Sequence, residues 1–236
     1  MIDVHCHFDM AQSPETYIAD NEKKGINTIG MTNLPSHFCI GIDHVKLYKY
    51  IRLALGLHPL LAKEHYKEYS KFKQYIDKTS YIGEIGLDFS REGFSTKEIQ
   101  IKSFEFVLDF IKEKNKILSL HSRRAEKEIL QMLLDKNIQN AIFHWYSGSL
   151  STLRNIINNG FFFSINSAMI QSDNGKKIIS EIPKGLILTE TDFPFIENSN
   201  IINIHNYLSQ LWSMSLSDVE HIIDSNFKKL ISQLNS

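Results

Sequence analysis

Two histidines separated by one residue, His5 and His7, follow a short apolar segment at the start of the chain. Side chains at alternate positions of a β-strand point to the same face, so a strand here presents both imidazoles on one side. Imidazole nitrogens are common ligands of divalent metal ions, and two on one face suit a single ion. Cys6 between them then faces the other way, and we expect no disulfide between it and Cys39.

Four later apolar segments end in side chains of the same chemical type, namely Glu84, His121, His144 and Asp192. The carboxyl ends of parallel strands meet at one rim of a barrel, so donors far apart in the sequence become neighbours there. Six donors exceed the number that one tetrahedral ion needs, and we therefore predict two divalent ions. Our assignment gives His5, His7 and Asp192 to the first ion, gives His121 and His144 to the second, and places Glu84 between them.

The chemistry that such a centre performs is hydrolysis. Two ions about 3.5–4 Å apart hold and deprotonate a water while they stabilise charge on a phosphoryl or carbonyl oxygen. Asp192 is the expected proton acceptor as well as a ligand, and Glu84 is expected to be essential as the bridge. Mixed imidazole and carboxylate donors suit Zn²⁺ or Mn²⁺, while Mg²⁺ prefers more oxygen, so the sequence leaves the metal open among the three.

Other side chains near the same rim are candidates for contacts with the substrate. His58 follows the third apolar segment, and we predict a substrate or proton-transfer contact, with helix capping or core packing as the alternative. Arg123 and Arg124 follow His121 and suit the anchoring of phosphate oxygens, with one of the two turned to solvent. Trp145 and Tyr146 are the candidates for stacking on a nucleobase.

Two more aromatic residues adjoin these positions. Phe193 and Phe195 flank Pro194 and are candidates for a cleft wall. Aromatic side chains more often pack in cores, so core packing is the alternative for all of them.

The elements that must position these residues alternate between short apolar runs and longer amphipathic segments, which is typical of repeated βα units. Eight runs predict eight parallel strands and hence a (β/α)₈ TIM barrel, in one domain over residues 1–236. The predicted strands are Ile2 to His5, Thr28 to Met31, Leu53 to Leu57, Tyr81 to Ile85, Ile117 to His121, Ala141 to His144, Phe161 to Ile165 and Leu186 to Glu190. Ser95 and Glu98 form a possible capping box before a helix that carries Ile101, Phe104 and Leu108.

Composition limits the functional classes less sharply. With 42% hydrophobic residues among 236, the chain can bury a large core, and its net charge of −1 gives no general attraction to polyanions. Nucleic acid is therefore neither required nor excluded as a partner. Since no secretory signal and no run of 18 apolar residues is present, we expect a soluble cytoplasmic protein.

Six segments of the chain together resemble the TatD family of metal-dependent deoxyribonucleases. They are His5-Cys6-His7, Gly56 to Pro59, Gly83 to Asp88, His121 to Arg123, His144 to Gly148 and Glu190 to Pro194. The resemblance implies a TIM barrel of the amidohydrolase type, two divalent metal cations and hydrolysis of DNA phosphodiester bonds. By position it implies the same six ligands that the strand ends suggest.

Three segments, 120–125, 144–149 and 164–169, are most similar to the TatD-like nuclease subfamily of the Qat anti-phage defence systems (QatD). That resemblance implies bacterial antiviral defence with other Qat components as partners. The chain departs from the wider family at Arg124, where an acidic residue is common, and at Trp145, where cysteine is common, and both changes bear on substrate choice.

Two other functions stay open. One is an amidohydrolase-type enzyme acting on a small amide, lactone or phosphoester, although many such barrels bridge their metals with a carboxylated lysine where this chain has Glu84. The other is a catalytically silent DNA-binding or scaffold subunit of a defence complex.

Overall fold

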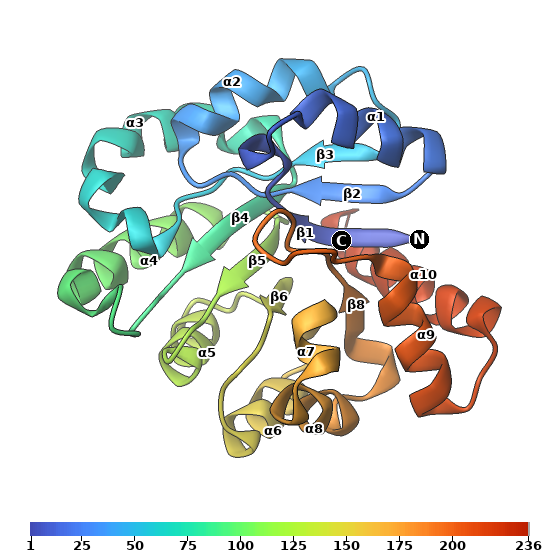
Figure 1. Cartoon of the computed structure of the whole chain (residues 1–236). Helices are drawn as coiled ribbons and strands as arrows, with labels where there is room; N and C mark the ends of the chain where they lie inside the picture. The colour runs from blue at the N-terminus through green and yellow to red at the C-terminus, as the bar shows by residue number, and fades with distance from the viewer. Residues whose placement is uncertain (236) are drawn as a thin grey trace.

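A computed structural model, which describes residues 1–235, contains eight parallel strands arranged around a central axis (Figure 1). Within it, β1, β2 and β3 pair in that order, and so do β4 to β8. The strands are β1 (Ile2–Cys6), β2 (Asn27–Gly30), β3 (Ile51–Leu53), β4 (Tyr81–Gly86), β5 (Ile117–His121), β6 (Ala141–His144), β7 (Phe162–Ile165) and β8 (Ile187–Thr189).

Backbone hydrogen bonds join the two groups of strands at both seams. Next to β3, the amide of Leu55 donates to the carbonyl of Tyr81 at 3.0 Å, and the amide of Gly83 donates to Leu55 at 3.0 Å. At the other seam, the amide of Asp192 donates to the carbonyl of His5 at 3.0 Å. The prediction of a (β/α)₈ TIM barrel is confirmed.

Helices surround the strands and bury their apolar faces against them (Figure 1). Phe104, Val107 and Leu108 of α4, for example, are each at most 2% exposed. The α-helices are α1 (Pro14–Lys24), α2 (Pro35–Val45), α3 (His65–Tyr75), α4 (Lys97–Ile111), α5 (Glu126–Asp135), α6 (Leu150–Asn158), α7 (Ser167–Gln171), α8 (Asp173–Glu181), α9 (Ile201–Trp212) and α10 (Leu216–Ser232). Short 3₁₀ helices are η1 (Phe8–Met10), η2 (Pro59–Glu64), η3 (Ile76–Lys78), η4 (Phe94–Thr96), η5 (Lys184–Leu186) and η6 (Gln233–Asn235).

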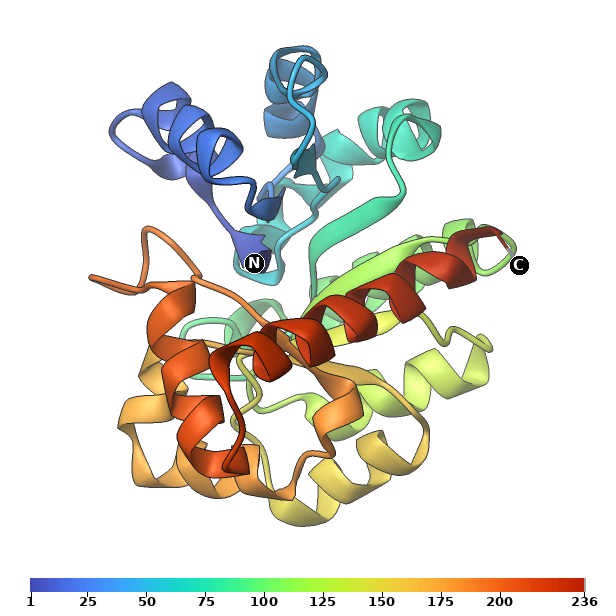
Figure 2. The ribbon, with the colours of Figure 1, turned by 90° about the vertical axis from the view of Figure 1, so that its right-hand side faces the viewer.

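The last helix, α10, crosses the end of the barrel at which the strands begin (Figure 2). It buries Val219, Ile223 and Phe227 there, and its Glu220 pairs with the terminal amine of Met1 at 2.8 Å. Because this end is covered, the opposite rim, where the strands finish, is the one that remains for a site. None of the helices within residues 1–235 combines the length and the apolar character needed to span a membrane.

Two local predictions were wrong. The third strand is Ile51–Leu53, because the chain leaves β2 after Leu53 and Leu55 bridges to Ile82 of β4 instead. The capping box at Ser95 does not form, since Ser95 lies inside the 3₁₀ turn η4 and α4 begins at Lys97 without a side-chain cap.

Candidate metal centre

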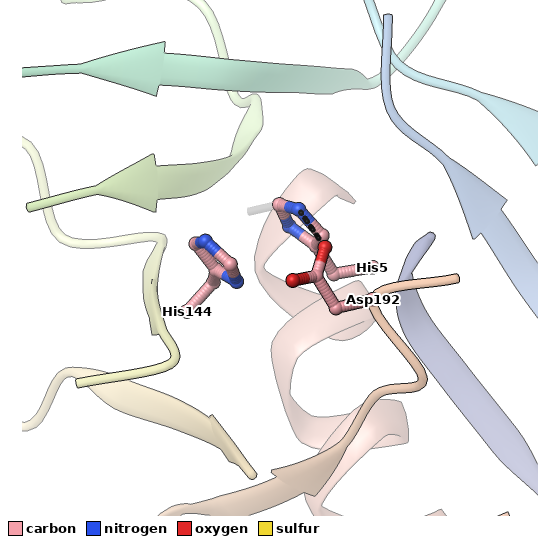
Figure 3. Close-up of side chains that lie close together, drawn as sticks. All are labelled: His5, His144 and Asp192. Atoms are coloured by element: carbon pink, nitrogen blue, oxygen red, sulfur yellow. Dashed lines mark ion pairs between the residues drawn. The ribbon is translucent and has the colours of Figure 1, made fainter. Parts of the chain in front are cut away.

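The six predicted ligands come together at the carboxyl ends of the strands. His5 and His7 come from the end of β1, and Asp192 comes from the segment after β8. Figure 3 shows that His5, His144 and Asp192 point toward one another, with His5 Nε2 and Asp192 Oδ1 3.8 Å apart. Combinations of these donors lie within 4.8 Å of one another, namely His5, His144 and Asp192; His5, His7 and Glu84; and His58, Glu84 and His121.

The carboxylate of Glu84 lies at the middle of the cluster, and its two oxygens face different histidines. Oε2 is 3.0 Å from Nε2 of His7 and 3.5 Å from Nε2 of His5. Oε1 is 2.6 Å from Nδ1 of His121 and 3.4 Å from Nε2 of His144. A carboxylate that offers one oxygen to each of two imidazole pairs has the arrangement of a bridging ligand.

Three of the histidines are held by a second partner on the ring nitrogen that faces away from Glu84. Nδ1 of His5 lies 2.7 Å from the hydroxyl of Ser119, and Nε2 of His121 lies 2.7 Å from Oδ2 of Asp88. Nδ1 of His144 lies 3.3 Å from Oε1 of Glu190. Such partners fix the ring orientation and tautomer of metal-binding histidines in proteins.

Glu190 is itself held in place by hydrogen bonds. The hydroxyl of Ser164 and the side-chain amide of Asn166 both donate to its carboxylate, the latter at 2.8 Å. Glu190 is fully buried directly after β8, and its two partners lie on β7 and just after it, so its position is determined by the barrel rather than by solvent.

His58 lies in the same cluster, but its hydrogen bonds indicate a different role. Its Nε2 is 3.4 Å from Oε2 of Glu84, while its Nδ1 accepts a hydrogen bond from the amide of Leu60 at 3.2 Å. A neutral imidazole that accepts at Nδ1 carries its proton on Nε2, which leaves no lone pair there for a metal. The geometry therefore agrees better with a proton donor or substrate contact than with a ligand.

The first strand also fixes the segment that carries Asp192. Asp3 accepts hydrogen bonds from the backbone amide of Thr191 at 2.9 Å and from its hydroxyl at 2.6 Å. The hydroxyl of Tyr17 donates to the same carboxylate at 3.2 Å. Asp192 has a left-handed backbone with φ of 49°, a conformation that costs energy in a residue other than glycine and is kept by these neighbours.

Burial and crowding change the proton affinities of the donors. Burial lowers the pKa of His5 to about 4 and raises the pKa of Asp192 to about 7. Burial alone would also raise the pKa of Glu84, but the imidazoles of His58, His121 and His144 outweigh it and hold that pKa well below its ordinary value. Because metal ligands must be deprotonated, metal binding to these donors would compete with protons.

The crowding of the histidine nitrogens also indicates that this donor set suits metal ions. Nε2 of His5 and Nε2 of His7 face each other at 3.2 Å, and Nδ1 of His7 has no hydrogen-bond partner among the described residues. Buried imidazole nitrogens normally have hydrogen-bond partners. Nitrogens that instead lie close together around carboxylates are typical of a cation-binding site.

Two of the four predicted substrate residues, Arg123 and Trp145, line a cavity of about 310 Å³ next to the cluster, whereas His58 and Arg124 do not. Its lining is His121, Ser122, Arg123, His144, Trp145 and Ser147. Both arginines are exposed, but Arg123 approaches Glu92 at 3.6 Å and lines the cavity, whereas Arg124 is not part of this lining.

Sequence reasoning missed Asp3, Asp88 and Glu190. Asp3 lies two residues before His5 on the same strand face, and Glu190 lies two residues before Asp192. The alternation that identified the histidine pair would have found Asp3, whereas Glu190 and Asp192 both lie after β8, where strand alternation does not apply.

Comparison with known proteins gives similarities in sequence and in fold. The profile of the family described as TatD related DNase matches residues 2–232. An uncharacterised metal-dependent hydrolase of Methanocaldococcus jannaschii is 26% identical over 98% of this chain and 97% of its own length. The human protein named deoxyribonuclease TATDN3 is 25% identical over 99% of this chain and 95% of its own length. The crystal structure of YJJV, a TatD homologue from Escherichia coli, superposes with a TM-score of 0.86 at 20% identity, covering 98% and 97% of the two chains.

Proposed function

The chain belongs to the family of TatD-related DNases, which are metal-dependent hydrolases, and on that premise we propose that it hydrolyses DNA phosphodiester bonds at a dinuclear metal centre. The observation that carries the proposal is the position of Glu84, whose two oxygens each face a separate pair of imidazoles. One carboxylate between two groups of nitrogen donors suits two ions better than one.

The roles of the residues follow from where they lie. His5, His7 and Asp192 would hold one ion, His121 and His144 the other, and Glu84 both. Divalent ions bound there would lower the pKa of a water and stabilise negative charge on the phosphoryl oxygens. Asp192 accepts the proton of the attacking water, and the guanidinium of Arg123 beside His121 pairs with a phosphate oxygen of the strand.

Incubation of the purified protein with end-labelled DNA and Mg²⁺, Mn²⁺ or Zn²⁺ tests this function. We expect strand degradation that stops with a chelator and is lost in Asp192→Ala. Cleavage of a small amide, lactone or phosphoester but not of DNA would favour the amidohydrolase alternative. Tight DNA binding without cleavage under every metal would favour a silent scaffold.

The number of ions is tested separately. Metal analysis of the protein, after reloading and removal of unbound ions, should give two per chain. A single ion that survives in Glu84→Gln would contradict the bridging role.

Two finer predictions concern the cell rather than the site. A role in anti-phage defence with other Qat components rests on the three segments 120–125, 144–149 and 164–169, and the cytoplasmic location also stays a prediction. Phage challenge of cells that carry the complete gene cluster, with wild type or Asp192→Ala, tests the defence role: protection that does not depend on Asp192 would contradict it.

A further inference from the structure

A continuous series of aromatic ring contacts runs through the metal centre. Phe195 meets His7 edge to face at 5.1 Å between ring centroids, and His7 meets His5 at 5.1 Å. His5 stacks on His144 at 3.8 Å, and Trp145 lies against His144 at 6.4 Å. The three imidazoles are buried, whereas the two rings at the ends, Trp145 and Phe195, are 38% and 57% exposed.

The neighbouring aromatic residues differ from these two because they belong to the core. Tyr146 is 1% exposed, packs edge to face on Phe163, and donates its hydroxyl to the carbonyl of Ser149. Phe193 stacks on Tyr17 with a centroid distance of 4.4 Å and an angle of 2° between the rings. Core packing therefore accounts for Tyr146 and Phe193, and it does not account for Trp145 or Phe195.

The backbone at Trp145 adds a second observation. Its φ is +40°, in the left-handed region that bulky residues rarely adopt. Unfavourable backbone conformations that the core does not require are concentrated at functional sites. Here the conformation places the indole in the lining of the cavity of about 310 Å³, beside His121, His144 and Arg123.

The cavity offers what a nucleotide needs. An exposed indole provides a stacking surface, Arg123 provides a positive charge for a phosphate, and His144 connects the cavity to the metal centre. Stacking of a base on an aromatic side chain tolerates any base but requires that the base be unpaired.

We propose that Trp145 binds the base of a nucleotide adjacent to the scissile phosphate, and that Phe195 contacts the nucleotide on the other side of that phosphate. This inference rests on the proposed function and adds the residues that select the substrate. The exposed faces of Trp145 and Phe195 hold the two bases apart while the phosphate between them lies at the histidines.

A binding experiment tests the role of Trp145 without turnover. The chain has two tryptophans, and Trp212 lies on α9 with the ammonium of Lys184 5.4 Å from its ring. The variant Trp212→Phe therefore leaves Trp145 as the single indole fluorophore. Titration with a short phosphorothioate oligothymidylate should quench its fluorescence, while a phosphorothioate strand of abasic sites, with the same charge and no bases, should not. Binding of oligothymidylate, followed by a label on the DNA, without quenching would overturn the proposal.

A kinetic experiment separates this inference from the proposed function. Trp145→Ala should raise KM for a single-stranded oligonucleotide by about 5-fold to 100-fold with a smaller change in kcat, because one stacking contact is lost. Alanine keeps a Cβ, so the substitution does not make the left-handed backbone at position 145 more favourable, and the change in KM reports the loss of the ring. On an oligonucleotide with an abasic site beside the scissile phosphate, wild type and Trp145→Ala should have the same KM.

Control variants complete the design. Tyr66→Ala removes another exposed aromatic ring, 86% exposed on α3, and should leave KM unchanged. Trp145→Phe should recover part of the affinity. If wild type degrades no DNA, the proposed function fails and this inference with it. If wild type degrades DNA but Trp145→Ala raises KM by the same factor on normal and on abasic oligonucleotides, only the inference fails.

Discussion

Two arcs of the barrel rim contribute to the centre in different ways. The β1–β8 arc, made of His5, His7 and Asp192, is closed, because these side chains are 0%, 1% and 5% exposed. The β5–β6 arc begins with His121, which is 15% exposed, and opens into the cavity lined by Trp145. In the proposed mechanism, the closed arc would hold an ion with little access to bulk solvent, and the open arc would admit the substrate beside it.

The difference lies in how each arc is supported. On the closed arc, Asp3 ties β1 to the segment after β8 through two hydrogen bonds from Thr191, and it accepts a third from Tyr17 of α1. On the open arc, support comes from buried carboxylates behind the rings, and the front faces remain accessible. Glu84 of β4 is the residue that belongs to both arcs.

Glu84→Ala is expected to have the largest effect, because it removes the ligand that the two arcs share. Nuclease activity should fall on the order of 10³-fold or more, with loss of both ions, since each would lose a negative ligand. The measurements are strand degradation and metal content. Glu84→Gln keeps the shape and should also lose the ions, so retention of both in that variant would refute a shared ligand. Cys6→Ser, on the opposite face of β1, is the control and should stay near wild type.

Asp192→Asn tests whether the closed arc also performs chemistry. Asparagine keeps the size and the local hydrogen bonds but cannot accept a proton, so kcat should fall by at least about 100-fold with a small change in KM. Single-turnover assays under saturating metal isolate this step. An unchanged kcat would show that a group other than Asp192 accepts the proton.

Glu190→Gln and Asp3→Asn remove one supporting carboxylate from each arc and so compare the arcs directly. Loss of the partner behind His144 should weaken metal affinity by about 10-fold to 100-fold, the usual effect of removing a carboxylate behind a metal-binding histidine. Asp3→Asn should instead lower kcat, because it loosens the segment that carries Asp192. Calorimetric metal titration together with kcat measures both. If the two variants change metal affinity and kcat to the same extent, the two arcs do not have distinct roles.

The sequence was sufficient to predict the barrel and the convergence of the six donor side chains at its rim, because both depend on local patterns. Strands β5 and β6 have the predicted bounds, and a donor at the end of each strand needs only the alternation of side chains to be placed. Asp3 was included in an apolar run, although it has the same parity as His5 and His7. Applying alternation to every polar residue near a strand end would have found it.

Other features depend on contacts that no local pattern encodes. Ser119 supports His5 across 114 positions, and this pairing depends on how β1 and β5 face each other inside the closed barrel. The left-handed backbones at Asp192 and Trp145 carry no glycine or asparagine to signal them. No local pattern indicates that Trp145 is exposed and Tyr146 is buried either, because adjacent residues in a loop have no fixed alternation.

Arg123→Ala and Arg124→Ala form a matched pair and should have the smallest effects. Each variant removes one positive charge from the same loop, so any general attraction for DNA changes equally. Arg123 lines the cavity beside His121, whereas Arg124, with φ of 59°, is exposed outside it. We expect Arg123→Ala to raise KM about 5-fold to 10-fold and to lower the salt dependence of binding by about one phosphate contact. Arg124→Ala should change KM by no more than about 2-fold, because salt screens an exposed charge that lies at a distance from the bound DNA. Equal effects of the two variants would mean that the open arc attracts DNA by its overall charge rather than by a defined phosphate contact.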